Sequence, residues 1–154
     1  MTQRRITVSF EVRFPEVDSY GVVWHGHYLA YFEVARNALC AAAGLTPAEA
    51  LALGYKVPII RFDANVKRPA HLDDTLEVSA LLKTPETAKL VMDYEVRRLP
   101  KRELLASGST EQVLLNPDGE LLLGFPGPVK TLVDRILAFQ RGEAALTGTK
   151  ILGG

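Results

Sequence analysis

Several features that carry common functions are rare or absent in this sequence of 154 residues. There is one cysteine, Cys40, which excludes an intrachain disulfide and a cysteine-based zinc site. No apolar run approaches the ~20 residues that cross a bilayer, and the first residues are not followed by the apolar core of a signal peptide. Lysine plus arginine (18) balances aspartate plus glutamate (18) without a basic tract, which argues against nucleic-acid binding.

Catalytic motifs with a strong sequence signature are missing as well. No Gly-x-Ser-x-Gly, Walker A or Rossmann pattern occurs anywhere in the chain. Hydrophobic residues make up 47% and charged residues 23%, which are proportions typical of a globular domain. We therefore expect a cytoplasmic protein with one domain over residues 1–141 and a flexible C-terminal tail over residues 142–154, where small and polar residues dominate.

The first part of the chain predicts a strand and then a long helix. Residues 7–14 alternate between polar and apolar side chains, which is typical of a half-buried strand with Phe14 on its apolar side. Pro15 is expected to end this strand, because proline cannot donate to the ladder. Residues 28–43 carry many alanines at helical spacing and predict a largely buried helix that Gly44 caps.

The remainder predicts a short helix, a run of strands and a terminal helix. Thr46 and Glu49 form a capping box with Pro47 at the first helical position. Alternating patterns predict strands over residues 60–67, 76–83, 90–97 and 103–115, with a further short strand at 121–125. The apolar spacing over residues 129–140 is typical of an amphipathic helix.

This order of elements favours an α+β fold, in which a curved antiparallel sheet of five or six strands wraps around the long helix. A helix with small and apolar residues on several sides needs cover on several sides. The later strands also carry apolar residues on both faces, such as Leu81 and Val91. We therefore expect a homodimer or homotetramer, in which other copies cover part of the outer face.

The segment FPEVDSYGVVWHGHYLAYFEVAR, residues 14–36, gathers most of the candidate functional groups. Asp18 either closes an Asx turn, as a loop aspartate commonly does, or supplies a catalytic carboxylate near the start of the helix. The free N–H groups of a helix start could stabilise an oxyanion formed from an attacked carbonyl. Asp18 opposite them could then act as the nucleophile or activate water, which suits hydrolysis of an activated acyl group.

Other residues of this region have competing interpretations. His25 is either a catalytic or substrate-contacting residue or a structural one, and a metal site made by His25, His27 and His71 is disfavoured because nothing marks His71 as close. Glu33 and Arg36 are three residues apart on the helix and are expected to pair. Cys40 is expected to be an inert buried thiol.

These residues resemble the 4-hydroxybenzoyl-CoA thioesterase family of hotdog-fold proteins, and especially its branch of Tol–Pal-associated acyl-CoA thioesterases. The matching residues are Glu16, Asp18, Gly21-Val22-Val23, Trp24, His25, Tyr28-Leu29 and Tyr31-Phe32-Glu33-Val34-Ala35-Arg36. The resemblance implies the hotdog fold, dimers that join their sheets edge to edge, and an active site at the dimer interface. It also implies cleavage of an acyl-CoA thioester, with Asp18 and His25 as the catalytic residues and the His25 N–H as an oxyanion donor.

The same resemblance implies contacts to an acyl- or aryl-CoA substrate. A second oxyanion donor would come from residues 54–58 of the neighbouring subunit. The candidate substrate-binding residues are Trp24, Tyr28, Pro58, Lys67, Arg68 and Lys89. The basic residues among them are either solvated strand ends or a dock for the phosphates of CoA. The hairpin of residues 83–89 has only two lysines, where the branch that acts on aromatic substrates has a basic triplet.

The sequence therefore predicts an acyl-CoA thioesterase that needs no metal and no cofactor, since coenzyme A is part of the substrate. Two other classes stay open. The chain could be a non-catalytic hotdog module that binds acyl-CoA or a partner protein, or a dehydratase on the same fold. Retention of Asp18 argues against the binding module, and a dehydratase needs a catalytic histidine with an acidic partner in a different motif.

Overall fold

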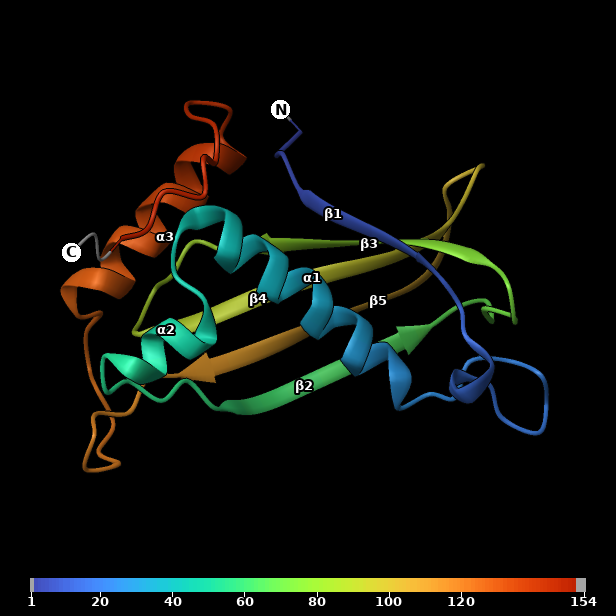
Figure 1. Ribbon diagram of the computed structural model, residues 1–154, viewed down its shortest axis with the longest axis horizontal. Helices are drawn as coiled ribbons and strands as arrows, with labels where there is room; N and C mark the ends of the chain where they lie inside the picture. Colours follow the sequence, from blue (N-terminus) through green and yellow to red (C-terminus); the bar gives the residue numbers. More distant parts are fainter. Residues whose placement is uncertain (1, 152–154) are drawn as a thin grey trace.

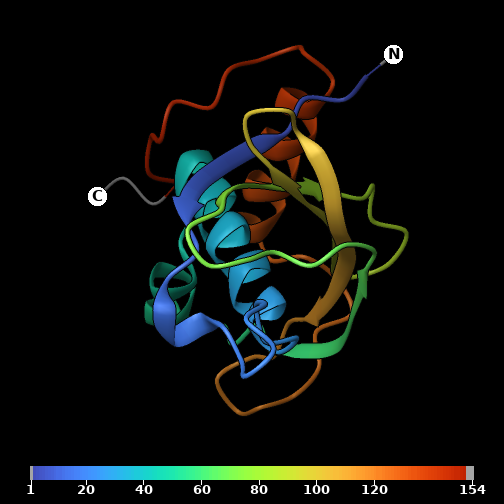
Figure 2. The same cartoon turned by 90° about the vertical axis from the view of Figure 1, so that its right-hand side faces the viewer.

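A five-stranded antiparallel sheet curves around one long helix in the computed structural model, which describes residues 2–151 (Figure 1). The elements are β1 (Ile6–Glu11), a 3-10 turn (Phe14–Glu16), α1 (His27–Ala43), α2 (Pro47–Ala52), β2 (Ile59–Val66), β3 (Thr75–Leu82), β4 (Lys89–Arg98), β5 (Glu103–Val113) and α3 (Gly127–Gln140). Figure 2 shows the strands arching around α1. The predicted α+β fold is confirmed.

The strands follow the order β1-β3-β4-β5-β2, and every neighbouring pair is antiparallel. β1 and β2 are therefore the two edges of the sheet. Of the predicted five or six strands, five are formed by the described residues. Residues 121–125 do not form a sixth, because their strand pairing is limited to one isolated bridge, between Leu121 and Leu115.

The first strand is shorter than predicted, and Phe14 is not on a buried side. Its side chain is 77% exposed, because the chain leaves the ladder after Glu11 and turns at the Phe14–Glu16 segment. Pro15 has no N–H and cannot continue the ladder. The Arg13 N–H donates to the Glu16 carboxylate at 2.9 Å, which closes the turn. This early turn directs the next segment toward the start of α1.

The long helix packs closely on the middle of the sheet. Phe32, Ala35 and Leu39 are wholly buried on the side that faces the strands. The Phe32 ring stacks on Tyr94 with centroids 4.6 Å apart, and a Cβ at Gly108 on β5 would lie 2.5 Å from the Phe32 ring. The opposite side of α1 is less covered than predicted, since Val34 is 47% exposed.

The ends of the helices have the expected caps. Gly44 ends α1 in the left-handed conformation, with φ of 102°, where a residue with a Cβ would be strained. The predicted capping box of α2 is confirmed, because the Thr46 hydroxyl accepts the Glu49 N–H at 3.1 Å and the Glu49 carboxylate accepts the Thr46 N–H at 3.2 Å. No helix in the described part of the chain has the length and hydropathy of a bilayer-spanning segment.

The last helix is anchored to the sheet by a buried amide. Gln140 donates to the Leu82 carbonyl and accepts the Leu82 N–H, both at 2.8 Å. After α3 the chain runs back along the end of α1, where the N–H of Ile151 donates to the Gly44 carbonyl at 3.1 Å. The division into a domain over residues 1–141 and a flexible tail over 142–154 stays a prediction, and residues 152–154 lie outside the described residues.

The close approach of α1 to β5 can be tested at Gly108. A Gly108→Ala variant places a methyl group against the Phe32 ring and the Asp63 carbonyl oxygen, so we expect it to lower the free energy of unfolding by about 1–3 kcal/mol. Urea unfolding measures this change. Gly124→Ala is the matched control, because a Cβ at Gly124 has no neighbour within 4 Å among the described residues. Equal stability of the two variants would contradict the packing argument.

Candidate active site

The segment between the 3-10 turn and α1 is held in place by backbone hydrogen bonds. Val17 and Val23 form an antiparallel bridge, and the Asp18 N–H donates to the Val22 carbonyl at 2.9 Å. On its other side, the Val23 N–H donates to the Ala70 carbonyl at 2.8 Å. The segment is therefore a small hairpin that is bonded to the connection between β2 and β3.

Glu16 ties this hairpin to α1. Its carboxylate is buried and accepts the Arg13 N–H, the Arg13 guanidinium at 3.1 Å and the Tyr31 hydroxyl at 3.1 Å. Burial alone would raise the pKa of Glu16, but these bonds from Arg13 and Tyr31 outweigh it and lower the pKa of the carboxyl below its usual value. The same contact and burial raise the pKa of the Tyr31 hydroxyl.

Sequence reasoning did not find this role of Glu16. Glu16 was noticed only as the first acidic residue of a motif, although its spacing from Arg13 and the intervening Pro15 are signals of a turn closed by a side chain. The partner Tyr31 lies 15 residues away on α1, and only the folded chain brings it near.

Asp18 is half-buried and lies next to the turn of the hairpin. One of its carboxylate oxygens accepts the Tyr20 N–H at 2.8 Å, and the Gly21 N–H donates to the Asp18 carbonyl at 2.9 Å. The Asx turn considered from the sequence is thus present. Within the described residues the second carboxylate oxygen has no hydrogen-bond donor, so the carboxylate is held by one oxygen and free at the other.

The start of α1 offers backbone donors beside this hairpin. Gly26 is the N-cap and has no side chain to satisfy the first turn. The His27 N–H donates back to the Trp24 carbonyl at 2.9 Å. The N–H groups of His25 and Gly26 have no acceptor among residues 2–151, and they lie at the positive end of the helix dipole. Such a pair of donors can bind a carbonyl oxygen that gains negative charge.

Trp24 and the two histidines form an aromatic group at the same helix start. The Trp24 ring lies 4.9 Å from the His25 ring and 5.7 Å from the His27 ring, between centroids. The indole lies against Gly26, where a Cβ would come within 2.1 Å of it, so a larger residue at this position would displace the Trp24 ring. The indole is 47% exposed and His25 is exposed, so both can contact a molecule that approaches the helix start.

Tyr28, another predicted substrate contact, points into the core. Its side chain is buried, and its hydroxyl accepts the Ala70 N–H at 3.4 Å. Burial raises the pKa of this hydroxyl. Tyr28 therefore joins α1 to the same β2–β3 connection that holds Val23.

The predicted basic and proline positions divide between the two ends of β2. Lys67 and Arg68 follow the end of β2 near the Asp18 hairpin, and Arg68 forms an ion pair with Glu103. Pro58 precedes β2 and Lys89 begins β4, both at the opposite end of the sheet (Figure 1). Within one chain, the candidate residues are therefore not all brought together.

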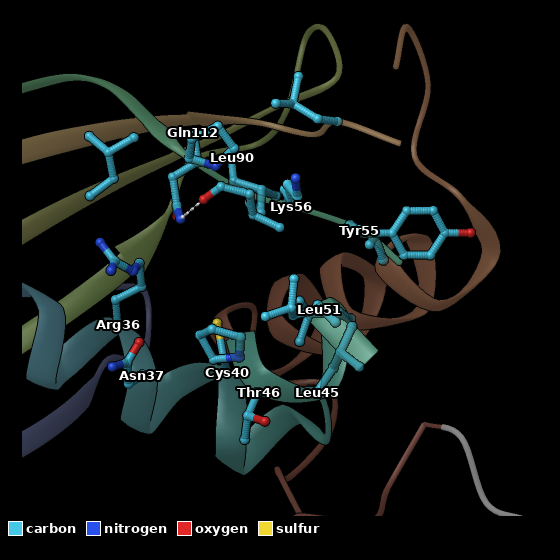
Figure 3. Close-up of a pocket in the computed structure, with 18 of the residues that line it drawn as sticks. Arg36, Asn37, Cys40, Leu45, Thr46, Leu51, Tyr55, Lys56, Leu90 and Gln112 are labelled. Atoms are coloured by element: carbon cyan, nitrogen blue, oxygen red, sulfur yellow. Dashed lines mark hydrogen bonds between the residues drawn. The ribbon is translucent and has the colours of Figure 1, made fainter. Parts of the chain in front are cut away.

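A cavity of about 550 Å³ lies at this opposite end, between the second half of α1, α2 and the start of β2 (Figure 3). Its lining is mostly apolar and includes Leu45, Leu51 and Leu90. Cys40 also lines it, and burial raises the pKa of the Cys40 thiol to about 11, so the thiolate nucleophile is scarce at neutral pH. The inert character expected of Cys40 agrees with this position.

No metal cluster is found in the part of the chain that the structure describes. Residues 2–151 contain no group of three or more His, Cys, Asp and Glu side chains placed to hold a metal ion. The His71 N–H donates to the Asp74 carboxylate at 2.9 Å, and Asp74 also pairs with Arg98 at 3.0 Å.

The bonds of Glu16 predict a pH-dependent contribution to stability. Because the pKa of Glu16 is lower in the folded chain, its contribution is complete above its unfolded pKa and is lost as the pH falls through the folded pKa. We expect Glu16→Gln to lower the free energy of unfolding by about 1–3 kcal/mol at pH 7. Urea unfolding from pH 7 down to pH 3 should show the gap to the wild type closing. Glu11→Gln, at an exposed position of β1, is the control and should show no such gap.

Comparison with known proteins agrees with the fold. "Putative acyl-CoA thioesterase YneP" of Bacillus subtilis (strain 168) is 27% identical over 108 residues, covering 70% of this chain and 78% of that protein. The DHNA-CoA thioesterase of Staphylococcus aureus superposes with a TM-score of 0.79 at 24% identity, over 92% of this chain and 97% of that one. A hypothetical protein of Staphylococcus aureus in complex with CoA has a TM-score of 0.79 at 15% identity, over 100% and 95%.

The family model described as "Thioesterase superfamily" matches residues 20–105, which is more than half of the chain. The match begins within the Asp18 hairpin and continues through α1 and the sheet to β5. The expected enzyme class, a thioester hydrolase, is confirmed. The chain belongs to the thioesterase superfamily of hotdog-fold proteins.

Proposed function

We propose that this chain hydrolyses the thioester of an acyl- or aryl-CoA, with Asp18 as the catalytic carboxylate. Two observations carry the proposal: one Asp18 carboxylate oxygen has no donor among the described residues, and the N–H groups of His25 and Gly26, at the helix start that follows the same hairpin, have no acceptor there. The names of the related proteins support the substrate class, since they include an acyl-CoA thioesterase and a DHNA-CoA thioesterase, and another neighbour was determined with CoA bound.

In the proposed reaction, the thioester carbonyl oxygen accepts the His25 N–H. This bond and the helix dipole stabilise the negative charge that develops when the carbonyl carbon is attacked. Asp18 either attacks this carbon itself, forming an acyl-enzyme anhydride that water then cleaves, or takes a proton from the attacking water. In both cases the carbon–sulfur bond breaks, and CoA leaves as the thiol.

The complete site is proposed to need two copies of the chain. Asp18 and the acyl-sized cavity lie at opposite ends of β2, whose outer edge is unpaired in the described residues. Antiparallel pairing of two β2 edges exchanges these ends, so that Asp18 of one copy approaches the cavity of the other. Ile60 (54% exposed) and Phe62 (58% exposed) are apolar side chains on this edge, and such exposure favours a buried interface.

This pairing would make a homodimer, and two such dimers could form a homotetramer. It would also bring residues 54–58, with Pro58, toward the partner's helix start, where one of their N–H groups could be the second oxyanion donor. We assign His25 to the catalytic site and Trp24 to the wall around the thioester, while Tyr28 would act by holding the helix start.

The phosphates of CoA are proposed to contact basic residues near the site. Lys83 and Lys89 line a second cavity of about 330 Å³ on the β3–β4 hairpin, and neither has an ion-pair partner in the described residues. Lys67, which follows the end of β2, also has no ion-pair partner in the described residues, whereas Arg68 forms an ion pair with Glu103. Two lysines on the hairpin can attract phosphate, although the aromatic branch has three basic residues there.

The remaining parts of the proposal follow the sequence motif. His25 favours the Tol–Pal-associated branch over the branch that acts on aromatic acyl groups, and that assignment stays a prediction. The reaction as written uses no metal and no resident cofactor, because coenzyme A enters and leaves with the substrate. A cytoplasmic location is also proposed, since acyl-CoA substrates are made and used there.

The catalytic role of Asp18 can be tested by measuring CoA thiol release from a panel of aliphatic and aromatic acyl-CoAs. Asp18→Asn keeps the size of the side chain and removes its charge, so we expect kcat to fall by ~10²-fold or more. Asp134→Asn, on the exposed side of α3, is the control and should keep full activity. Equal release by wild type and Asp18→Asn would exclude this role, and binding of acyl-CoA without release would favour the binding module. Enoyl-CoA in place of free thiol would identify a dehydratase.

The shared site predicts complementation between two inactive variants. Asp18→Asn removes the carboxylate, and Asn37→Trp fills the cavity from an exposed position on α1. Heterodimers are isolated after co-expression with two different affinity tags. Each would contain one intact site, so we expect about half of the wild-type activity from two chains that are inactive as homodimers. A heterodimer as inactive as its parents would show that each chain uses its own Asp18 and its own cavity.

A further inference from the structure

Arg36 is the one charged side chain buried in the wall of the α1–α2 cavity. It projects from α1 with 6% of its side chain exposed, and its Nη2 donates to the Glu33 carboxylate at 3.1 Å. Its Nε has no hydrogen-bond partner among the described residues. Figure 3 shows Arg36 extending from α1 at one side of the cavity, toward the sheet that carries Gln112.

This arrangement leaves a strong donor unused in a place where polar groups are normally paired. A buried N–H without an acceptor costs about 1–3 kcal/mol, and the cost is greater for a charged group. Glu33 balances the charge only from the surface, because its side chain is 59% exposed. The Gln112 amide nitrogen is itself a donor, to the Val57 carbonyl at 3.0 Å. The Tyr94 hydroxyl lies near Arg36 and bonds to Thr110 at 2.7 Å. Because Arg36 lines the cavity and Glu33 is its one hydrogen-bond acceptor among the described residues, a molecule in the cavity can supply a further acceptor to the guanidinium.

The rest of the cavity limits what that molecule can be. Its volume of about 550 Å³ is within the range of small-ligand sites, and its walls are mainly apolar side chains, among which leucine is the most frequent. An apolar body therefore fits the walls, and one oxygen fits the donor. A wholly apolar acyl group would bury the Arg36 N–H without an acceptor, so it would bind less well.

We infer that Arg36 is a specificity residue, and that the acyl group this enzyme accepts carries a hydroxyl or carboxylate oxygen that binds the Arg36 guanidinium. The inference rests on the proposed function, because it takes the α1–α2 cavity as the acyl site. Arg36 would select the oxygen-bearing acyl group, and Asp18 would carry out the same chemistry on any thioester that reaches it.

Matched substrate pairs test the inference on the wild-type enzyme. The pairs are benzoyl-CoA with 4-hydroxybenzoyl-CoA, and hexanoyl-CoA with adipoyl-CoA, in which the terminal methyl is replaced by a carboxylate. We expect kcat/KM to be about tenfold or more higher for the oxygen-bearing member of at least one pair. Hydrolysis without preference in both pairs would overturn the inference and leave the proposed function standing. No thiol release from any of the four would instead count against the proposed function.

Variants then assign the preference to Arg36. Arg36→Met keeps an unbranched side chain without donors, so the preference should fall to within about twofold while hydrolysis of the apolar member is retained. Glu33→Gln is the control, since it removes the surface partner and keeps the guanidinium, and it should keep the preference. Should Arg36→Met fail to fold, Arg36→Leu takes its place and is expected to lose the preference too, because it also has no donor. A preference that persists in a folded Arg36 variant would overturn the assignment.

Discussion

The close packing of α1 on β4 and β5 is the contact on which the other features depend. Phe32 stacks on Tyr94 and lies over Gly108, where no side chain intervenes between helix and strand. This contact sets the height and direction of α1 above the sheet. The helix start is thereby placed beside the Asp18 hairpin, and its second half becomes one wall of the cavity. Both functional regions are consequences of the position of one helix.

Two buried charged side chains, Glu16 near α1 and Arg36 on it, differ in how far their hydrogen-bonding groups are satisfied. Glu16 is surrounded by donors from Arg13 and Tyr31, which outweigh its burial and keep it ionised. Its hydrogen bond with Tyr31 holds the hairpin against the helix. Arg36 is equally buried, but part of its guanidinium has no partner in the described residues. The first charge stabilises the fold, and we infer that the second binds an oxygen of the acyl group.

In the proposed dimer, the separation of Asp18 from the cavity accounts for the exposed apolar edge of β2. A single chain of this topology cannot bring the two ends of its edge strand together, since β2 and α1 are both rigid. A twofold axis across that edge can, because it pairs the end of one strand with the start of the other. Exposed Ile60 and Phe62 are then explained by assembly rather than by instability of the chain.

Local patterns predicted most of the elements, because alternation, capping boxes and breakers act over a few residues, but the short strand predicted at 121–125 is not formed. The α+β fold, the α2 capping box and the Asx turn at Asp18 follow from such patterns. The early turn at Phe14 was missed, since alternation alone does not reveal that Glu16 takes the Arg13 N–H. What only the tertiary structure decided involves partners distant in sequence: the Glu16–Tyr31 bond, the division of candidate residues between two ends of β2, and the unsatisfied Nε of Arg36. These depend on which surfaces meet after folding, and no short-range pattern encodes that.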